Sequence, residues 1–166
     1  SRKAWKVSYM HDNSIDVGDE LDLMDWVPDK DMVSSLMSLS GWLSNSDQEP
    51  EETYNSTNSP MSGPNRFTDI GSAKEEGFKG LIVPGNYGMM AMESAVKKWI
   101  PDSTIKKMDC VFRQPLMQGD RVQVGGVVTD RIEEQDKVIL ELDLYIIRDD
   151  GQRPQGGTAI VEIGLN

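Results

Sequence analysis

The sequence predicts an α+β fold in which one buried helix packs on an antiparallel sheet. Residues 86–99 carry apolar side chains over much of a helical circumference, which indicates a helix buried on most sides. After Pro101 the apolar pattern changes to a period of two, which is typical of strands. Short turns separate these strands, so neighbouring strands are expected to run antiparallel.

Length and charge narrow the class of protein. The 166 residues suffice for one core, so we expect a single domain over 1–166. The net charge is 17 − 28 = −11 without a basic stripe, which argues against a nucleic-acid partner. Apolar runs are shorter than a membrane span, and the single Cys110 allows no internal disulfide. We expect a cytoplasmic protein without a membrane partner or a metal site.

The first elements follow a short polar segment. Val17 and Gly18 predict a turn that enters a strand reaching Trp26 and Val27. Asp29 is placed to cap a helix predicted over 29–43, because its side chain can accept a hydrogen bond from the first turn. The apolar residues of this helix fall near one face: Met32, Val33, Leu36, Met37 and Leu43.

Residues 44–64 form a stretch of different composition. It lacks Val, Ile, Leu, Phe and Trp, and it carries four acidic residues with no Lys or Arg. Such a segment buries too little apolar area to offset the entropy of ordering. We therefore expect a long acidic loop that moves freely without ligand, either as a disordered insertion or as a lid over a binding cleft.

The remaining elements are predicted from periodicity and from helix breakers. A short helix is expected over 69–77, and the main helix over 86–99 should end before Pro101. Strands are expected over 104–114, 121–133, 137–148 and 157–165. In the third of these, one face is apolar throughout: Val138, Leu140, Leu142, Leu144 and Ile146.

Several short motifs stand in a particular order along the chain. They are Val17-Gly18-Asp19-Glu20-Leu21, Gly77-Phe78-Lys79-Gly80, Ile82-Val83-Pro84-Gly85, Phe112-Arg113, Pro115, Gly119-Asp120 and Gly157-Thr158-Ala159. Their order and spacing resemble the MaoC-like branch of the hotdog fold, the (R)-specific enoyl-CoA hydratases and acyl dehydratases. The resemblance covers most of the chain outside 44–64. It implies a hotdog fold, a long central helix wrapped by a curved antiparallel sheet.

The same resemblance exposes a departure in the catalytic loop. Hydratases of this family hold water with an Asp and a His five residues apart, upstream of a further Asp. With that further Asp matched to Asp69, the His position holds Phe67 and the first Asp position holds Ser62. The only histidine of the chain is His11, near its start. The binding architecture still carries over, above all the N–H of Gly85, which would meet a thioester carbonyl.

The candidate site residues follow from this match. Asp69 and Asn65 are the catalytic candidates in the loop, although Asp69 would equally serve as a helix cap. A carboxylate base near neutral pH would need desolvation to raise its pKa. Asn86 has the same alternative role as a cap for the main helix. The expected substrate-binding residues are Gly85, Asn86, Tyr87, Arg66, Phe67 and Arg113.

Glu93 opens a second functional hypothesis. Some hotdog thioesterases place a catalytic carboxylate about two turns into the central helix, and Glu93 lies eight residues after Gly85. Burial of an unpaired carboxylate on this helix would raise its pKa and suit it to base catalysis. The alternative is that Glu93 faces solvent or an ion pair between subunits.

Three functions therefore stay open at this point. The first is a hydratase- or dehydratase-related enzyme with altered catalytic groups, the second a thioesterase that uses Glu93, and the third a non-catalytic thioester-binding or structural subunit. The expected ligand is an acyl-CoA or acyl-carrier thioester, with coenzyme A as part of the substrate and no separate cofactor. The resemblance implies a homodimer or higher even oligomer, or a heterodimer with a second hotdog chain.

Overall fold

The computed structural model describes residues 15–39 and 64–165. The acidic stretch 44–64, apart from its last residue, lies outside the described residues, as do His11 and Ser62. The described chain falls into two compact units. The first consists of residues 15–26, 86–114 and 122–165, and the second consists of 27–39, 64–85 and 115–121. The expectation of a single domain over 1–166 stays a prediction.

The first unit contains a five-stranded antiparallel sheet in the order β1-β3-β4-β5-β2. Its strands are β1 (Met24–Trp26), β2 (Thr104–Phe112), β3 (Val122–Glu133), β4 (Lys137–Arg148) and β5 (Gln155–Gly164). The long strands agree with those predicted from period two, and β5 begins two residues earlier than predicted. Since β4 lies at the centre, its apolar row is fully covered, with Val138, Leu140 and Leu142 at 0% exposure.

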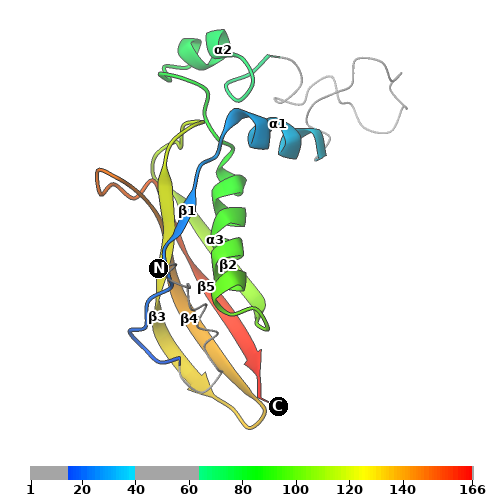
Figure 1. Ribbon diagram of the computed structural model, residues 1–166, viewed down its shortest axis with the longest axis vertical. Helices are drawn as coiled ribbons and strands as arrows, with labels where there is room; N and C mark the ends of the chain where they lie inside the picture. The colour runs from blue at the N-terminus through cyan, green and yellow to red at the C-terminus, as the bar shows by residue number, and fades with distance from the viewer. Residues whose placement is uncertain (1–14, 40–63, 166) are drawn as a thin grey trace, which may run out of the picture. The chain divides into compact units, whose positions relative to one another are not determined.

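The long helix α3 (Gly85–Trp99) runs along one face of this sheet (Figure 1). Its buried residues are Tyr87, Gly88, Ala91, Met92, Ala95 and Val96. Gly88 allows a close approach to the sheet, because a Cβ at this position would lie 3.1 Å from Cδ1 of Ile146 in β4. One long helix against an antiparallel sheet confirms the predicted α+β class.

The second unit contains two short helices. Helix α1 (Lys30–Leu39) starts where Asp29 Oδ1 accepts a hydrogen bond from the N–H of Met32 at 2.8 Å, as the sequence predicted. The predicted continuation over 40–43 lies outside the described residues. Helix α2 (Ile70–Glu75) is shorter than the predicted 69–77. It ends at Glu75, and the φ of 88° at Gly77 lets the N–H of Phe78 bond back to the carbonyl of Ala73.

No helix within the described ranges is both long enough and apolar enough to span a bilayer.

Candidate functional site

Asn65 organises the loop that the sequence matched to a catalytic loop. Its side chain is 8% exposed, and Oδ1 accepts the N–H of Phe67 at 2.9 Å. Its carbonyl oxygen accepts the N–H groups of Thr68 and Asp69 at 3.0 and 2.8 Å. These bonds fold residues 65–69 into one tight turn. The amide of Asn65 therefore fixes backbone geometry, which is a structural role for a residue predicted as catalytic.

Asp69 serves as the N-cap of α2. Its Oδ2 accepts the backbone N–H of Ser72 at 2.7 Å and the Ser72 hydroxyl at 2.9 Å. The backbone hydrogen bond from Ser72, aided by the side-chain bond, lowers the pKa of Asp69 below 3.8. The capping role that the sequence left open is thus present. A general base near neutral pH needs a pKa shifted in the opposite direction.

Arg66 and Phe67 lie side by side on the same loop. The Arg66 guanidinium donates to Glu76 Oε2 at 2.7 Å, and its Cζ lies 5.2 Å from the centroid of the Phe67 ring. Phe67 is buried, so the position matched to the family's histidine carries a buried apolar side chain. It has no atom that accepts a proton.

Gln118 is a polar contact of this loop that the sequence analysis missed. Its Nε2 donates to the carbonyl of Phe67 at 2.8 Å and to the carbonyl of Ile82 at 3.1 Å. It therefore joins the 65–69 loop to the segment that leads into α3. Gln118 Oε1 is buried without a hydrogen-bond partner among the described residues. Its only signal in the sequence was its place beside the Gly119-Asp120 motif.

The start of α3 is built around Gly85. The helix begins at this residue, so Asn86 lies inside its first turn rather than capping it, contrary to the alternative drawn from the sequence. Gly85 is partly exposed, Asn86 is exposed, and Tyr87 is buried. The N–H groups of a first helical turn have no acceptor within the helix, and they carry the positive end of its dipole. This turn therefore offers donors to a carbonyl or carboxylate oxygen.

Glu93 lies on the exposed side of α3, between the buried positions Met92 and Ala95. The burial that the thioesterase hypothesis requires is therefore not found in this chain. Its exposure agrees with the alternative that Glu93 faces solvent.

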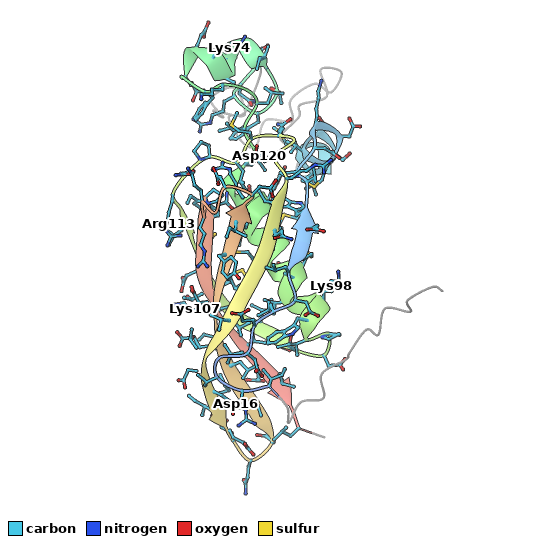
Figure 2. The ribbon with its side chains drawn as sticks, turned by 60° about the vertical axis from the view of Figure 1, so that its left-hand side comes forward. Asp16, Lys74, Lys98, Lys107, Arg113 and Asp120 are labelled. Atoms are coloured by element: carbon cyan, nitrogen blue, oxygen red, sulfur yellow. The ribbon has the colours of Figure 1, made fainter. Side chains whose placement is uncertain are left out.

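Arg113 follows β2 in the first unit and lies beside the start of β5. Its N–H donates to the carbonyl of Pro154 at 2.9 Å, and its guanidinium passes 2.9 Å from where a Cβ of Gly156 would lie. Figure 2 shows its exposed side chain along the same side of the sheet as Lys107. Lys107 is paired with Asp109 at 2.7 Å, which raises the pKa of the lysine, whereas none of the described carboxylates forms an ion pair with Arg113.

Gln155 is a second polar residue that the sequence analysis missed. It is the first residue of β5, is 2% exposed, and its Oε1 has no hydrogen-bond partner in the described part of the chain. This oxygen occupies the space that a Cβ of Gly88 would take, in the first turn of α3. A polar side chain thus lies in the buried row that continues as Ala159, Val161 and Ile163.

The predicted residues divide between the two units. The loop residues Asn65, Arg66, Phe67 and Asp69 lie together in the second unit, which also contains Gly85 at the start of α3. Asn86, Tyr87, Glu93 and Arg113 belong to the first unit. Across residues 15–39 and 64–165, no group of three or more His, Cys, Asp or Glu side chains is arranged to hold a metal ion. Cys110 is half-buried, and this burial raises the pKa of its thiol.

Comparison with solved structures shows which proteins share this architecture. The (R)-hydratase from A. caviae involved in PHA biosynthesis is 21% identical, with a TM-score of 0.68, over 90% of this chain and 98% of that one. The MaoC-like dehydratase from Rhodospirillum rubrum is 17% identical, with a TM-score of 0.67, over 93% of this chain and 96% of that one. The ChsH1-ChsH2 complex from Mycobacterium tuberculosis is 16% identical, with a TM-score of 0.66, over 89% of this chain and 97% of the matched chain.

Comparison by sequence finds no family model and no curated protein that matches the chain. The structural likeness extends over most of each chain. The chain therefore has the hotdog fold, in the form found in (R)-hydratases and MaoC-like dehydratases.

Proposed function

We propose that this chain is a MaoC-like protein that binds acyl thioesters, related to the hydratases and dehydratases of this fold but with altered catalytic groups. The observation that carries the proposal is the start of α3 at Gly85, on a fold shared with an (R)-hydratase and a MaoC-like dehydratase. The ligand is an acyl group carried by coenzyme A or by a carrier protein.

The chemistry of this position suits a thioester. The carbonyl oxygen gains negative charge when the carbonyl is polarised, and the free N–H of Gly85 at the positive end of α3 would stabilise that charge. Glycine presents this N–H without a side chain in the path of the carbonyl. Binding at this position therefore needs no side-chain base.

The loop supports binding more than rapid hydration. Asn65 holds a turn, Phe67 is buried, and the Asp69 carboxylate is occupied by two hydrogen bonds that lower its pKa. Asp69 and Asn65 are thus engaged in local structure, and neither is poised as a proton acceptor at neutral pH. We infer that water addition to an enoyl thioester is slow in this protein.

The nucleotide end of a coenzyme A ligand requires a cation. Arg113 is exposed and presents a planar fork of donors suited to phosphate. The net charge of −11 disfavours the binding of an anion over most of the surface, so a phosphate needs a cation whose charge is not already neutralised. Arg113 has no carboxylate partner among the described residues and is therefore a better candidate for this contact than Lys107, which is paired with Asp109. We assign the phosphate contact to Arg113.

A calorimetric titration with butyryl-CoA tests the proposal. Wild type should bind, and Gly85→Val should abolish binding because the added side chain blocks the carbonyl's path to the helix start. Gly164→Val is the matched control, since Gly164 has open space around it and lies at the end of β5. This variant should bind as wild type does.

The rate of water addition to crotonyl-CoA provides a second test of the proposal, and we expect it to be low. The loss of both general-base groups should remove at least the ~10²–10⁴-fold rate contribution that acid–base catalysis typically makes. Robust hydration would show that another group, Asp69 first, supplies the base. If wild type fails to bind butyryl-CoA, or if Gly85→Val binds as well as wild type does, the thioester proposal is wrong.

A further inference from the structure

Tyr145 stands between two glycines on the face of the sheet opposite α3. Its neighbour Ile146 approaches α3, and successive side chains of a strand alternate, so Tyr145 points to the other face, called here the outer face. The register places Gly125 of β3 opposite Tyr145 on one side and Gly156 of β5 on the other. Glycine is depleted within strands, and it often marks a place where another group comes close to the backbone.

Two side chains fill the space over these glycines. A Cβ on Gly125 would lie 2.8 Å from both Cζ and Oη of Tyr145, so the end of the aromatic ring lies over Gly125. A Cβ on Gly156 would lie 2.9 Å from Nη1 of Arg113, so this guanidinium lies over Gly156. The guanidinium of Arg153 in turn stacks on the Tyr145 ring, with its Cζ 4.0 Å from the ring centroid.

This arrangement brings two guanidinium groups to one place on the outer face. Residues directly opposite each other in a sheet have Cβ atoms about 4.5–5.5 Å apart, so the group over Gly156 lies beside Tyr145, on which Arg153 stacks. The backbone agrees, since the N–H of Arg113 donates to the carbonyl of Pro154, the residue after Arg153, at 2.9 Å. All of these residues belong to the first unit, so the pair lies within one compact body.

The charge of the two arginines is not balanced by a neighbour. The chain has 28 acidic residues, yet within the ranges 15–39 and 64–165 no carboxylate forms an ion pair with Arg113 or Arg153. Asp109, on the strand before Arg113, pairs with Lys107 instead. Two cations side by side repel each other, whereas an anion that accepts hydrogen bonds from both would be attracted twice.

We propose that Arg113 and Arg153 form a phosphate-binding site on the outer face of the sheet, and that its ligand carries a phosphate monoester. The planar forks of the two guanidinium groups match phosphate oxygens, and a phosphate monoester carries nearly two negative charges at pH 7. Tyr145 is the positioning residue, because its ring holds the guanidinium of Arg153. The site goes beyond the proposed function, since it lies on the face opposite α3 and requires no thioester.

Titration of ¹⁵N-labelled wild type with inorganic phosphate, at pH 7 and constant ionic strength, tests the inference. Two-dimensional NMR spectra follow the Nε–Hε signals of the arginine side chains. The signals of Arg113 and Arg153 should shift along one saturating curve, whereas that of Arg131, which is paired with Glu133, should not. Acetate at the same ionic strength should not give the saturating shift, because it carries a single charge.

Substitutions separate the charge of the site from its geometry. Arg153→Gln should weaken phosphate binding by roughly 3- to 10-fold, which is the effect of one exposed charged contact. Tyr145→Leu keeps both charges but removes the ring, and it should weaken binding by a similar factor. Tyr145→Phe keeps the ring and should bind as wild type does. Lys98→Gln, which removes one charge from the exposed side of α3, is the control and should leave phosphate binding unchanged.

Coenzyme A and 3′-dephospho-coenzyme A distinguish two sources of the phosphate. A saturating shift of both arginine signals with coenzyme A alone assigns the site to its 3′-phosphate, and no such shift with either compound assigns it to another phosphorylated ligand. Both results support a phosphate site.

The inference is overturned if the shift with phosphate does not saturate or if acetate gives the same curve. It is also overturned if Arg153→Gln binds phosphate as tightly as wild type, or if Lys98→Gln weakens binding equally. Because Arg153 is exposed, its substitution decides the matter even if Tyr145→Leu does not fold. Failure of butyryl-CoA to bind would refute the proposed function and not this site, because the probe here is phosphate alone.

Discussion

The carboxylate of Asp69 is engaged by a neighbour that a catalytic base would have to displace. Both hydrogen bonds from Ser72 end on the same oxygen, Oδ2, and they stabilise the charged form at the start of α2. While these bonds hold, the carboxyl group protonates only below its ordinary pKa range, and a base in this position would have to give them up. The residue is therefore better explained as a cap than as an acid–base group.

Asp69→Asn separates these two roles. Asparagine caps a helix about as well as aspartate but carries no charge. The folded state lowers the pKa of Asp69 below its ordinary value of 3.8. The charged carboxylate therefore stabilises the fold above that pH, and this contribution is lost as the pH falls through the lowered pKa. The melting temperature of wild type should therefore exceed that of the variant at pH 7, and the gap should narrow in acid.

The same variant reports on chemistry. Thioester affinity and the rate of any residual hydration should match wild type, because Asp69 is expected to stabilise the start of α2 and not to act on the thioester carbonyl. A large loss of hydration in Asp69→Asn, with the melting temperature unchanged, would return Asp69 to a catalytic role.

Glu93→Gln gives the corresponding test of the thioesterase hypothesis. The side chain is exposed, so the variant should leave butyryl-CoA hydrolysis at the background rate of wild type. Free thiol release, followed with a chromogenic disulfide, measures this rate. Glu141→Gln, an exposed carboxylate on β4, is the control. If wild type hydrolyses the thioester and Glu93→Gln alone lowers the rate by orders of magnitude, the thioesterase hypothesis is correct.

Single residues in this chain were predictable where their partners are local. Asp29 and Asp69 act on N–H groups three residues away, and sequence rules for helix caps anticipate both. Gln118 acts on carbonyls 51 and 36 residues away, a relation that no local pattern encodes. Gln155 was missed for another reason, because the predicted strand began at residue 157 and the buried row begins two residues earlier.

The elements were predicted more accurately than the site, because periodicity reflects burial directly. In β4 the alternate residues are buried, and Glu141 and Asp143 between them are exposed, as period two requires. The buried residues are Val138, Leu140, Leu142, Leu144 and Ile146. Predicted strand ends differ from the observed ones by up to two residues, where turns rather than burial decide them. Helix α2 ended early because Gly77 adopts a positive φ, which composition alone does not specify.

At the level of elements, Gln118 holds two segments in place. Gln118→Leu removes the donors to the carbonyls of Phe67 and Ile82, and it should lower the free energy of unfolding by about 1–3 kcal/mol. Denaturant unfolding measures this change. Gln114→Leu is the matched control, because Gln114 is exposed and lies on the preceding segment, and it should stay within about 0.5 kcal/mol of wild type. Equal effects of the two variants would contradict the role given to Gln118.

At the scale of the whole molecule, the sheet ends in an unpaired strand. In the described sheet β2 pairs with β5 on one side only, and its nine residues leave a row of free backbone groups. Val111 and Phe112 at its end are 51% and 55% exposed. A long edge with exposed apolar side chains favours pairing with another chain, and a second copy offers the same edge in antiparallel register.

We therefore predict a homodimer or a higher even oligomer in which β2 takes part. Light scattering at micromolar concentration should give at least about twice 18.5 kDa for wild type. Val111→Lys should shift the mass towards the monomer, because a charged side chain on an exposed edge strand disfavours its pairing with another strand. Ile132→Lys is the matched control, since Ile132 is 52% exposed on β3, away from this edge, and its mass should stay that of wild type. A wild-type mass of 18.5 kDa would contradict the assembly itself, whereas an equal response of the two lysine variants would remove β2 from the interface and leave the oligomer to another surface.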